Sequence, residues 1–174
     1  MNYEIIGRMM ARWIRLGAIE PFDFDSLYAR LAAAQTQSAA PVLLWAQAET
    51  QYLFALIAPR KLAPGRVARW FSWALAPAVA TYRQFGFAAY LDDQAIWLHG
   101  RRIAESSVQA IGECAVVASS FLLRFPATCI ATPSSELEEA FRLRLEAQHG
   151  WQFDHSWLGA KPLVDRTDLA ADRA

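Results

Sequence analysis

Residues 96–107, with the sequence IWLHGRRIAESS, decide how this 174-residue chain is interpreted. An apolar run at residues 95–98 precedes His99-Gly100, and a second run extends over residues 102–111. Because glycine adopts positive φ without strain, His99-Gly100 is typical of a tight turn. The segment therefore predicts two antiparallel strands joined as a hairpin.

Apolar runs on both sides of this segment predict further strands. Residues 41–47 and 51–58 indicate two buried strands, separated by a short polar stretch as in a hairpin. A third strand is expected at residues 87–91, where Asp92-Asp93-Gln94 suits a tight turn. The apolar run at residues 114–125 predicts a long strand.

Helices are predicted before, between and after these strands. An acidic start and apolar residues at helical spacing favour a helix over residues 23–37. Pro64-Gly65 opens a long helical pattern, and Pro77 inside it predicts a kink or two consecutive helices. Residues 135–138 fit a capping box at the start of a last helix, which Gly150 ends.

These elements predict an α+β fold with one mixed, mostly antiparallel central sheet flanked by helices. Residues 12–16 open it as a short helix or a strand, and residues 126–133 form a loop or short strand bracketed by prolines. The length predicts a single domain over residues 1–174, with a loose tail after about residue 163.

Composition excludes several classes of protein. Seventeen basic and 17 acidic residues leave no surplus for neutralising phosphates, which argues against nucleic-acid binding. Near-zero net charge favours self-association, so a homo-oligomer is expected. No apolar run is long enough to span a membrane, and the first residues do not resemble a signal peptide, so a cytoplasmic location is expected. The seven tryptophans suggest that some serve an interface or pocket.

The segment Gly100-Arg101-Arg102-Ile103-Ala104-Glu105-Ser106-Ser107 resembles a motif of the lipoate ligases, octanoyl transferases and biotin protein ligases, which reads Gly-x-Lys-Ile-Ala/Ser-Gly-Ser. In those enzymes the lysine contacts the acyl or adenylate group. The resemblance extends diffusely over residues 20–125. It implies a biotin/lipoate ligase-like fold and lipoate, octanoate or an acyl-adenylate as the class of ligand.

Three departures from the family pattern argue against ligase chemistry. Arg102 stands at the lysine position, and Glu105 replaces a glycine. The family's Arg-Arg-x-x-Gly-Gly-Gly-type loop is missing, because residues 59–65 lead directly into the long helix. We therefore expect a divergent protein that binds an acyl or adenylate-like ligand, or a carrier protein such as a lipoyl domain. An accessory subunit of a split ligase, with a second subunit as partner, is an alternative.

The candidate ligand-binding residues each have a structural alternative. Arg101 and Arg102 either contact an anionic ligand or form a surface charge pair with Glu105. Glu105, Ser106 and Ser107 either line the lip of the site or are ordinary edge and turn residues.

Cys129 is the candidate catalytic residue, because octanoyl transferases carry a cysteine in a Pro-Cys-Gly-Ile-like loop in a comparable late region. It would make the protein a cysteine-dependent octanoyl or lipoyl acyltransferase. Cys114 lies in an apolar strand and is expected to be inert. His149 suits the last turn of its helix through the helix dipole. The scattered histidines predict no metal site.

Overall fold

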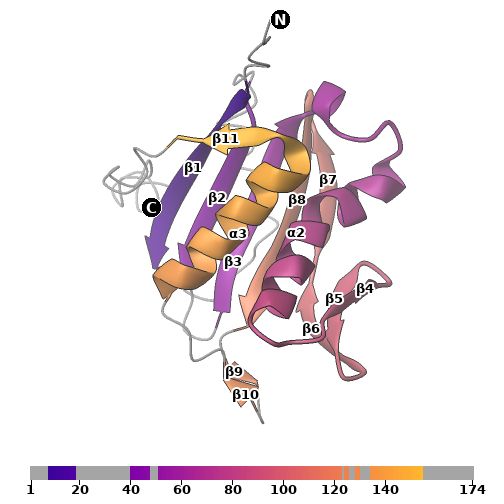
Figure 1. The fold of residues 1–174 in the computed structure, drawn as a ribbon. Coiled ribbons are helices and arrows are strands. Elements are labelled where there is room, and N and C mark those ends of the chain that lie inside the picture. The colour runs from indigo at the N-terminus through magenta and orange to yellow at the C-terminus, as the bar shows by residue number, and fades with distance from the viewer. Residues whose placement is uncertain are drawn as a thin grey trace, which may run out of the picture.

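A six-stranded mixed sheet forms the centre of the molecule (Figure 1). A computed structural model describes residues 8–18, 40–47, 51–122, 124–125, 128–129 and 134–154. The strands of the large sheet are β1 Met9–Ala18, β2 Val42–Gln47, β3 Gln51–Pro59, β7 Ser107–Ile111, β8 Cys114–Leu122 and β11 Trp151–Phe153. Their order is β11-β1-β2-β3-β8-β7, and only the two pairings of β1 are parallel. The predicted mixed, mostly antiparallel α+β arrangement is confirmed.

Two smaller sheets and two helices complete the described fold. A three-stranded sheet contains β4 Tyr90–Asp92, β5 Ala95–Leu98 and β6 Arg101–Glu105, and a two-stranded one contains β9 Arg124–Phe125 and β10 Thr128–Cys129. Helix α2 spans Trp70–Gln84 and α3 spans Ser134–His149, preceded in the chain by the 3-10 turns η1 Arg60–Leu62 and η2 Val67–Arg69. Both α-helices lie on the same face of the large sheet (Figure 1). No helix in the described ranges is both long and apolar enough to cross a membrane.

Phe141 of α3 lies at the centre of the core. Its ring is 4.7 Å from the ring of Phe54 and 5.0 Å from that of Phe121. Trp13 and Trp45 lie 6.1 and 6.0 Å from it. One helical side chain thus contacts rings from β1, β2, β3 and β8, which are adjacent in the sheet. Most of the described tryptophans are buried in this core and are not exposed for an interface.

Both faces of the central strands are buried, which explains why their sequences are continuously apolar. Alternate residues belong to two separate clusters of buried side chains, because successive side chains of a strand point to opposite faces. The first cluster, around Phe141, lies on the helix side. The second comprises Ile14, Val42, Leu44, Ala55, Ile57, Cys114, Val116 and Ala118.

Helix α2 continues through Pro77, so the predicted alternative of two consecutive helices is wrong. Proline has no amide hydrogen and cannot donate to the carbonyl of Trp73, four residues earlier. The side chain of Gln148 supplies the missing donor, with its Nε2 atom 3.0 Å from the Trp73 carbonyl oxygen. The Trp73 carbonyl, which has no donor within α2, therefore accepts a hydrogen bond from α3.

The predicted capping box at residues 135–138 is also wrong. Helix α3 begins at Ser134, and the carboxylate of Glu138 points to the sheet rather than to the helix backbone. It accepts hydrogen bonds from Trp13 Nε1 at 2.9 Å and from Arg15 at 2.8 and 2.9 Å. A buried carboxylate needs such partners, because burial without them costs several kcal/mol.

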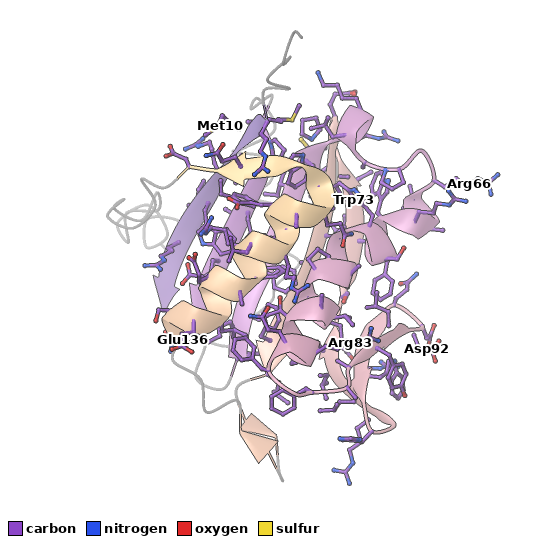
Figure 2. All side chains as sticks on the ribbon, viewed as in Figure 1. Met10, Arg66, Trp73, Arg83, Asp92 and Glu136 are labelled. Atoms are coloured by element: carbon purple, nitrogen blue, oxygen red, sulfur yellow. The ribbon has the colours of Figure 1, made fainter. Side chains whose placement is uncertain are left out.

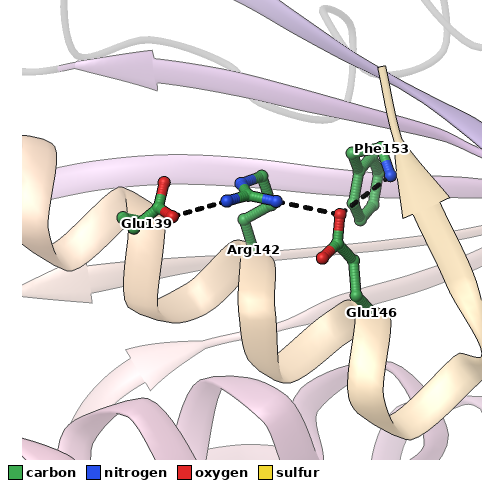
Figure 3. A network of polar contacts seen from close by, with 4 residues as sticks. All are labelled: Glu139, Arg142, Glu146 and Phe153. Atoms are coloured by element: carbon green, nitrogen blue, oxygen red, sulfur yellow. Dashed lines mark hydrogen bonds and ion pairs between the residues drawn. The ribbon is translucent and has the colours of Figure 1, made fainter. Parts of the chain in front are cut away.

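A second polar network joins α3 to β11 (Figure 3). The buried guanidinium of Arg142 bridges Glu139 at 2.5 Å and Glu146 at 2.9 Å. Glu146 also accepts the backbone amide of Phe153 at 2.9 Å. Strand β11 is only three residues long, and this bond fixes it beside the helix.

The structure corrects two further boundaries. The predicted strand at residues 102–111 is two strands, β6 and β7, which belong to different sheets. The strand expected at residues 87–91 is found only at Tyr90–Asp92. Residues 12–16 form part of a strand, as one of the two alternatives predicted. The expected helix at residues 23–37 and the tail after residue 163 lie outside the described residues.

We expect Gln148→Ala to lower the free energy of unfolding by about 1 kcal/mol, because the Trp73 carbonyl loses its donor. In a Pro77→Ala background the new amide can donate to that carbonyl, so the same change should cost much less. Urea unfolding of the four proteins in this double-mutant cycle measures the difference. An equal cost in both backgrounds would contradict the assignment.

We expect Glu138→Ala to lower the free energy of unfolding by about 2 kcal/mol, because Trp13 and Arg15 lose a charged acceptor. Glu136, an exposed residue two positions earlier, provides the matched control. Glu136→Ala should change stability by no more than about 0.5 kcal/mol. Chemical denaturation of both variants tests this, and similar losses would show that the buried carboxylate has no special role.

Candidate functional site

The hairpin that carries the motif turns at His99-Gly100, as predicted. His99 has φ of 50° and Gly100 has φ of 72°, so both occupy the left-handed region. Asp93 and Gln94 form an equivalent turn between β4 and β5, with φ of 43° and 55°. Turns of this kind match the twist of antiparallel strands. The two turns place β6 at the edge of the small sheet.

A bulge in β6 determines which motif residues face outward. Ile96 pairs with Ala104 and Trp97 pairs with Arg102, so Ile103 is an extra residue without an opposite partner. Such an insertion breaks the alternation of a strand. As a result, consecutive residues Ile103 and Ala104 are both buried, while Arg101 and Arg102 are both exposed. The Ile-Ala pair of the motif is therefore core.

Arg102 is engaged on the surface by two neighbours. Its Nη1 atom lies 3.2 Å from Glu105 Oε1, and its Cζ atom lies 5.4 Å from the centre of the Trp97 ring. The Arg102 side chain is 45% exposed and that of Glu105 is 82% exposed. Trp97 is held in place by a 2.8 Å bond from its Nε1 to the carbonyl of Asp92. The charge pair predicted as one alternative is thus present, and the guanidinium remains accessible to water.

Ser106 and Ser107 lie where the chain passes from one sheet to the other. Ser106 Oγ donates to Ser119 Oγ at 3.1 Å, and Ser119 Oγ donates to the Glu105 carbonyl at 3.2 Å. Ser107 starts β7 opposite Ala118, and its hydroxyl accepts a 3.4 Å bond from Gln109. The serines therefore have structural contacts with neighbouring strands. Their predicted place at the lip of a ligand site stays a prediction.

The two cysteines lie in different settings. Cys114 is buried at the start of β8, and burial raises the pKa of its thiol, with the nearby Glu113 adding to the shift. A raised pKa suppresses the reactive thiolate, which fits the expected inert role. Cys129 pairs with Arg124 in the short strand β10, and its side chain lies outside the described residues. The acyltransfer alternative that depends on Cys129 stays a prediction.

The sequence predicts that His149 interacts with the helix dipole as a cation, but the structure shows a different role. Its ring stacks 4.4 Å from Trp151 and lies 5.0 Å from Trp73. Its buried Nε2 atom has no hydrogen-bond partner among the described residues. Desolvation lowers the pKa of His149 to about 4, so the ring is neutral at pH 7. Aromatic packing, rather than the helix dipole, explains this histidine.

Sequence reasoning missed the cations between β3 and α2. Arg60, Lys61, Arg66 and Arg69 are all exposed. The local excess of positive charge is visible in the sequence, since no acidic residue lies between Glu49 and Asp92. As for metals, the described ranges contain no group of three or more His, Cys, Asp or Glu side chains that could hold an ion.

No protein-family model matches the sequence, and no curated protein matches it. Solved structures do. A lipoate-protein ligase A bound with ATP superimposes with a TM-score of 0.69 over 94% of this chain and 93% of its own, at 10% identity. The chain has the lipoate and biotin ligase fold. A bi-partite lipoate protein ligase from Thermoplasma acidophilum gives a TM-score of 0.66 at 9% identity, covering 94% and 91% of the two chains.

The same ligase fold is found with biotin enzymes. The biotin acetyl coenzyme A carboxylase synthetase from Helicobacter pylori, bound to biotinylated ATP, gives a TM-score of 0.59 at 13% identity. It covers 79% of this chain and 75% of that one. Likenesses at such low identity establish the ligase fold alone, because one fold supports many functions.

We expect His149 to make the protein less stable in acid. The folded-state pKa of about 4 lies below the ordinary 6.5, so from pH 6.5 downwards the unfolded chain takes up a proton that the folded chain does not. Above pH 6.5 the residue has no such effect. His149→Phe should therefore lose less stability than the wild type between about pH 7.5 and about pH 5.

Urea unfolding at both pH values measures this difference. His99→Asn is the matched control, because His99 is exposed in a turn that asparagine accepts. It should keep the wild-type pH dependence. If His149→Phe and the wild type lose stability in parallel, the desolvated ring is not the cause.

Proposed function

We propose that this protein uses the ligase fold for binding rather than for ligation, and that it holds an acyl or adenylate-like ligand, or a carrier protein. The observation that carries the proposal is the state of Arg102. It stands at the motif's lysine position, yet its guanidinium is paired with Glu105 and stacked on Trp97. A lysine amine is thereby replaced by a group that is always charged.

The chemistry of arginine supports binding without ligation. A guanidinium is never deprotonated in proteins, but it binds a carboxylate or phosphate with two parallel hydrogen bonds. The carboxylate of Glu105 already contacts Arg102 through one 3.2 Å bond from Nη1 to Oε1, and both side chains are reached by water. An anionic ligand would displace Glu105 and take over its contact. Arg101, Ser106 and Ser107 are the neighbouring polar residues along the chain.

A protein partner is the second part of the proposal. The structural analysis of the bi-partite ligase from Thermoplasma acidophilum, part of a lipoylation system, also covers its E2 lipoyl domain. In the present chain, residues 59–65 contain one glycine where the ligase motif carries several, so a partner subunit could complete the site. Partner and ligand are both consistent with a cytoplasmic protein that keeps its two cysteines reduced.

Thermal unfolding with added ligands tests the proposal. A non-hydrolysable acyl-adenylate at 100 times its dissociation constant should stabilise the protein by about 2.7 kcal/mol, which raises Tm by several degrees. We expect a shift with the acyl-adenylate and little with ATP alone. Arg102→Ala should abolish the shift, and Glu105→Gln should increase it, because the competing carboxylate charge is removed.

Arg144→Ala is the matched control, since Arg144 is an exposed arginine on α3 whose guanidinium donates hydrogen bonds to the side chain of Gln84. It should leave the shift unchanged. Release of pyrophosphate from ATP in the presence of lipoate, octanoate or biotin would contradict the proposal, because it would demonstrate ligase chemistry. Absence of any shift would restrict the proposal to its protein partner.

A further inference from the structure

Residues 60–69, called the basic segment below, form an exposed surface of one charge sign. They contain Arg60, Lys61, Arg66 and Arg69 and no acidic residue. All four cations are exposed, and Figure 2 shows Arg66 extending away from the body of the protein. Because the whole chain is neutral, this concentration is local rather than a reflection of composition.

The buried indole of Trp70 fixes the shape of the basic segment. Trp70 is 2% exposed, and its Nε1 donates to the Pro64 carbonyl at 2.7 Å. The guanidinium of Arg60 lies over the same ring at 5.9 Å, and the Arg60 amide donates to the Glu113 carbonyl at 2.8 Å. The cations are therefore displayed on an ordered frame.

Apart from the contact of Arg60 with the Trp70 ring, the positions of these charges have no structural explanation among the described residues. Arg69 is the N-cap of α2, and the first turn of that helix contains no acidic residue. Cations near a helix N-terminus oppose its dipole and reduce stability. Among the described residues, no carboxylate forms an ion pair with any of the four side chains to offset this cost.

We propose that the basic segment docks an acidic protein surface. Three of its four cations are arginines, whose planar guanidinium matches a carboxylate with two hydrogen bonds. Val67 lies between Arg66 and Arg69 and is 47% exposed, so the surface combines an apolar contact with a charged rim, as protein interfaces do. The inference names the chemistry of the partner in the proposed function, and rests on that part of it.

Two features favour a protein over a nucleic acid. Single-stranded nucleic acids bind through exposed aromatic rings on which bases stack. The basic segment contains no aromatic residue, and the adjoining Trp70 is buried. Nucleic-acid binders also carry a basic surplus, and this chain has none.

Fluorescence anisotropy with a fluorescein-labelled poly-glutamate peptide tests the docking surface. The wild type should bind the peptide, and binding should weaken as salt is added because surface charges are screened. Arg66→Glu combined with Arg69→Glu should reduce affinity by about tenfold or more, since two attractive charges become repulsive. Arg144→Glu, the same charge change on α3, should leave affinity within about twofold of wild type at the same salt concentration.

Arg66→Gln with Arg69→Gln is a milder second variant, and thermal unfolding confirms that each variant is folded. Peptide binding that is unchanged by both double variants, or lost equally in Arg144→Glu, would overturn the proposal. Tighter binding of a single-stranded DNA oligonucleotide than of the peptide would overturn it in favour of a nucleic acid. The acyl-adenylate shift should survive both double variants, so failure of the ligand site and failure of the docking surface are distinguishable.

Discussion

The packing of Phe141 against four neighbouring strands is the contact on which the architecture depends. Its ring meets Trp13, Trp45, Phe54 and Phe121, one from each strand between β1 and β8. Aromatic pairs contribute beyond the area they bury, and here four share one partner. The polar bonds of α3 act at the edges of this cluster, where Glu138 reaches β1 and Glu146 reaches β11. Helix position and sheet order are thus coupled.

The fold could be predicted where local chemistry determines it. The apolar runs at β2, β3, β5 and β8 predict strands, because a strand that is buried on both faces has a continuously apolar sequence. The split between β6 and β7 was missed, because residues 102–111 are locally continuous. They are divided at Ser106 by long-range pairing, since β6 pairs with β5 and β7 pairs with β8. The supposed capping box failed for a related reason, since the partners of Glu138 lie more than a hundred residues earlier in the chain.

The turn of the motif segment could be predicted from the sequence, but the orientation of its side chains could not. The motif predicted the turn at Gly100 and offered a surface pair between Arg102 and Glu105 as one alternative, which the structure contains. Whether a strand residue faces the core or water depends on register, and a single inserted residue reverses it. The cations of the basic segment can be counted in the sequence. Their arrangement around the buried Trp70 cannot be predicted from it. The ligase fold itself follows from the arrangement of elements, whereas its use depends on individual side chains.

The parallel pairing of β1 with β11 sets the order in which the molecule can be assembled. Met9 pairs with Trp151, so β1 and β11 cannot pair during synthesis until the ribosome has released nearly all of the described chain. Antiparallel neighbours such as β2 and β3 can form early, because few residues separate them. Until α3 and β11 are present, Met9–Ala11 lack their pairing with β11, and Trp13 lacks its contacts with Phe141 and Phe153. In a nascent chain, the edge of β1 that pairs with β11 therefore stays open to association until β11 has been synthesised.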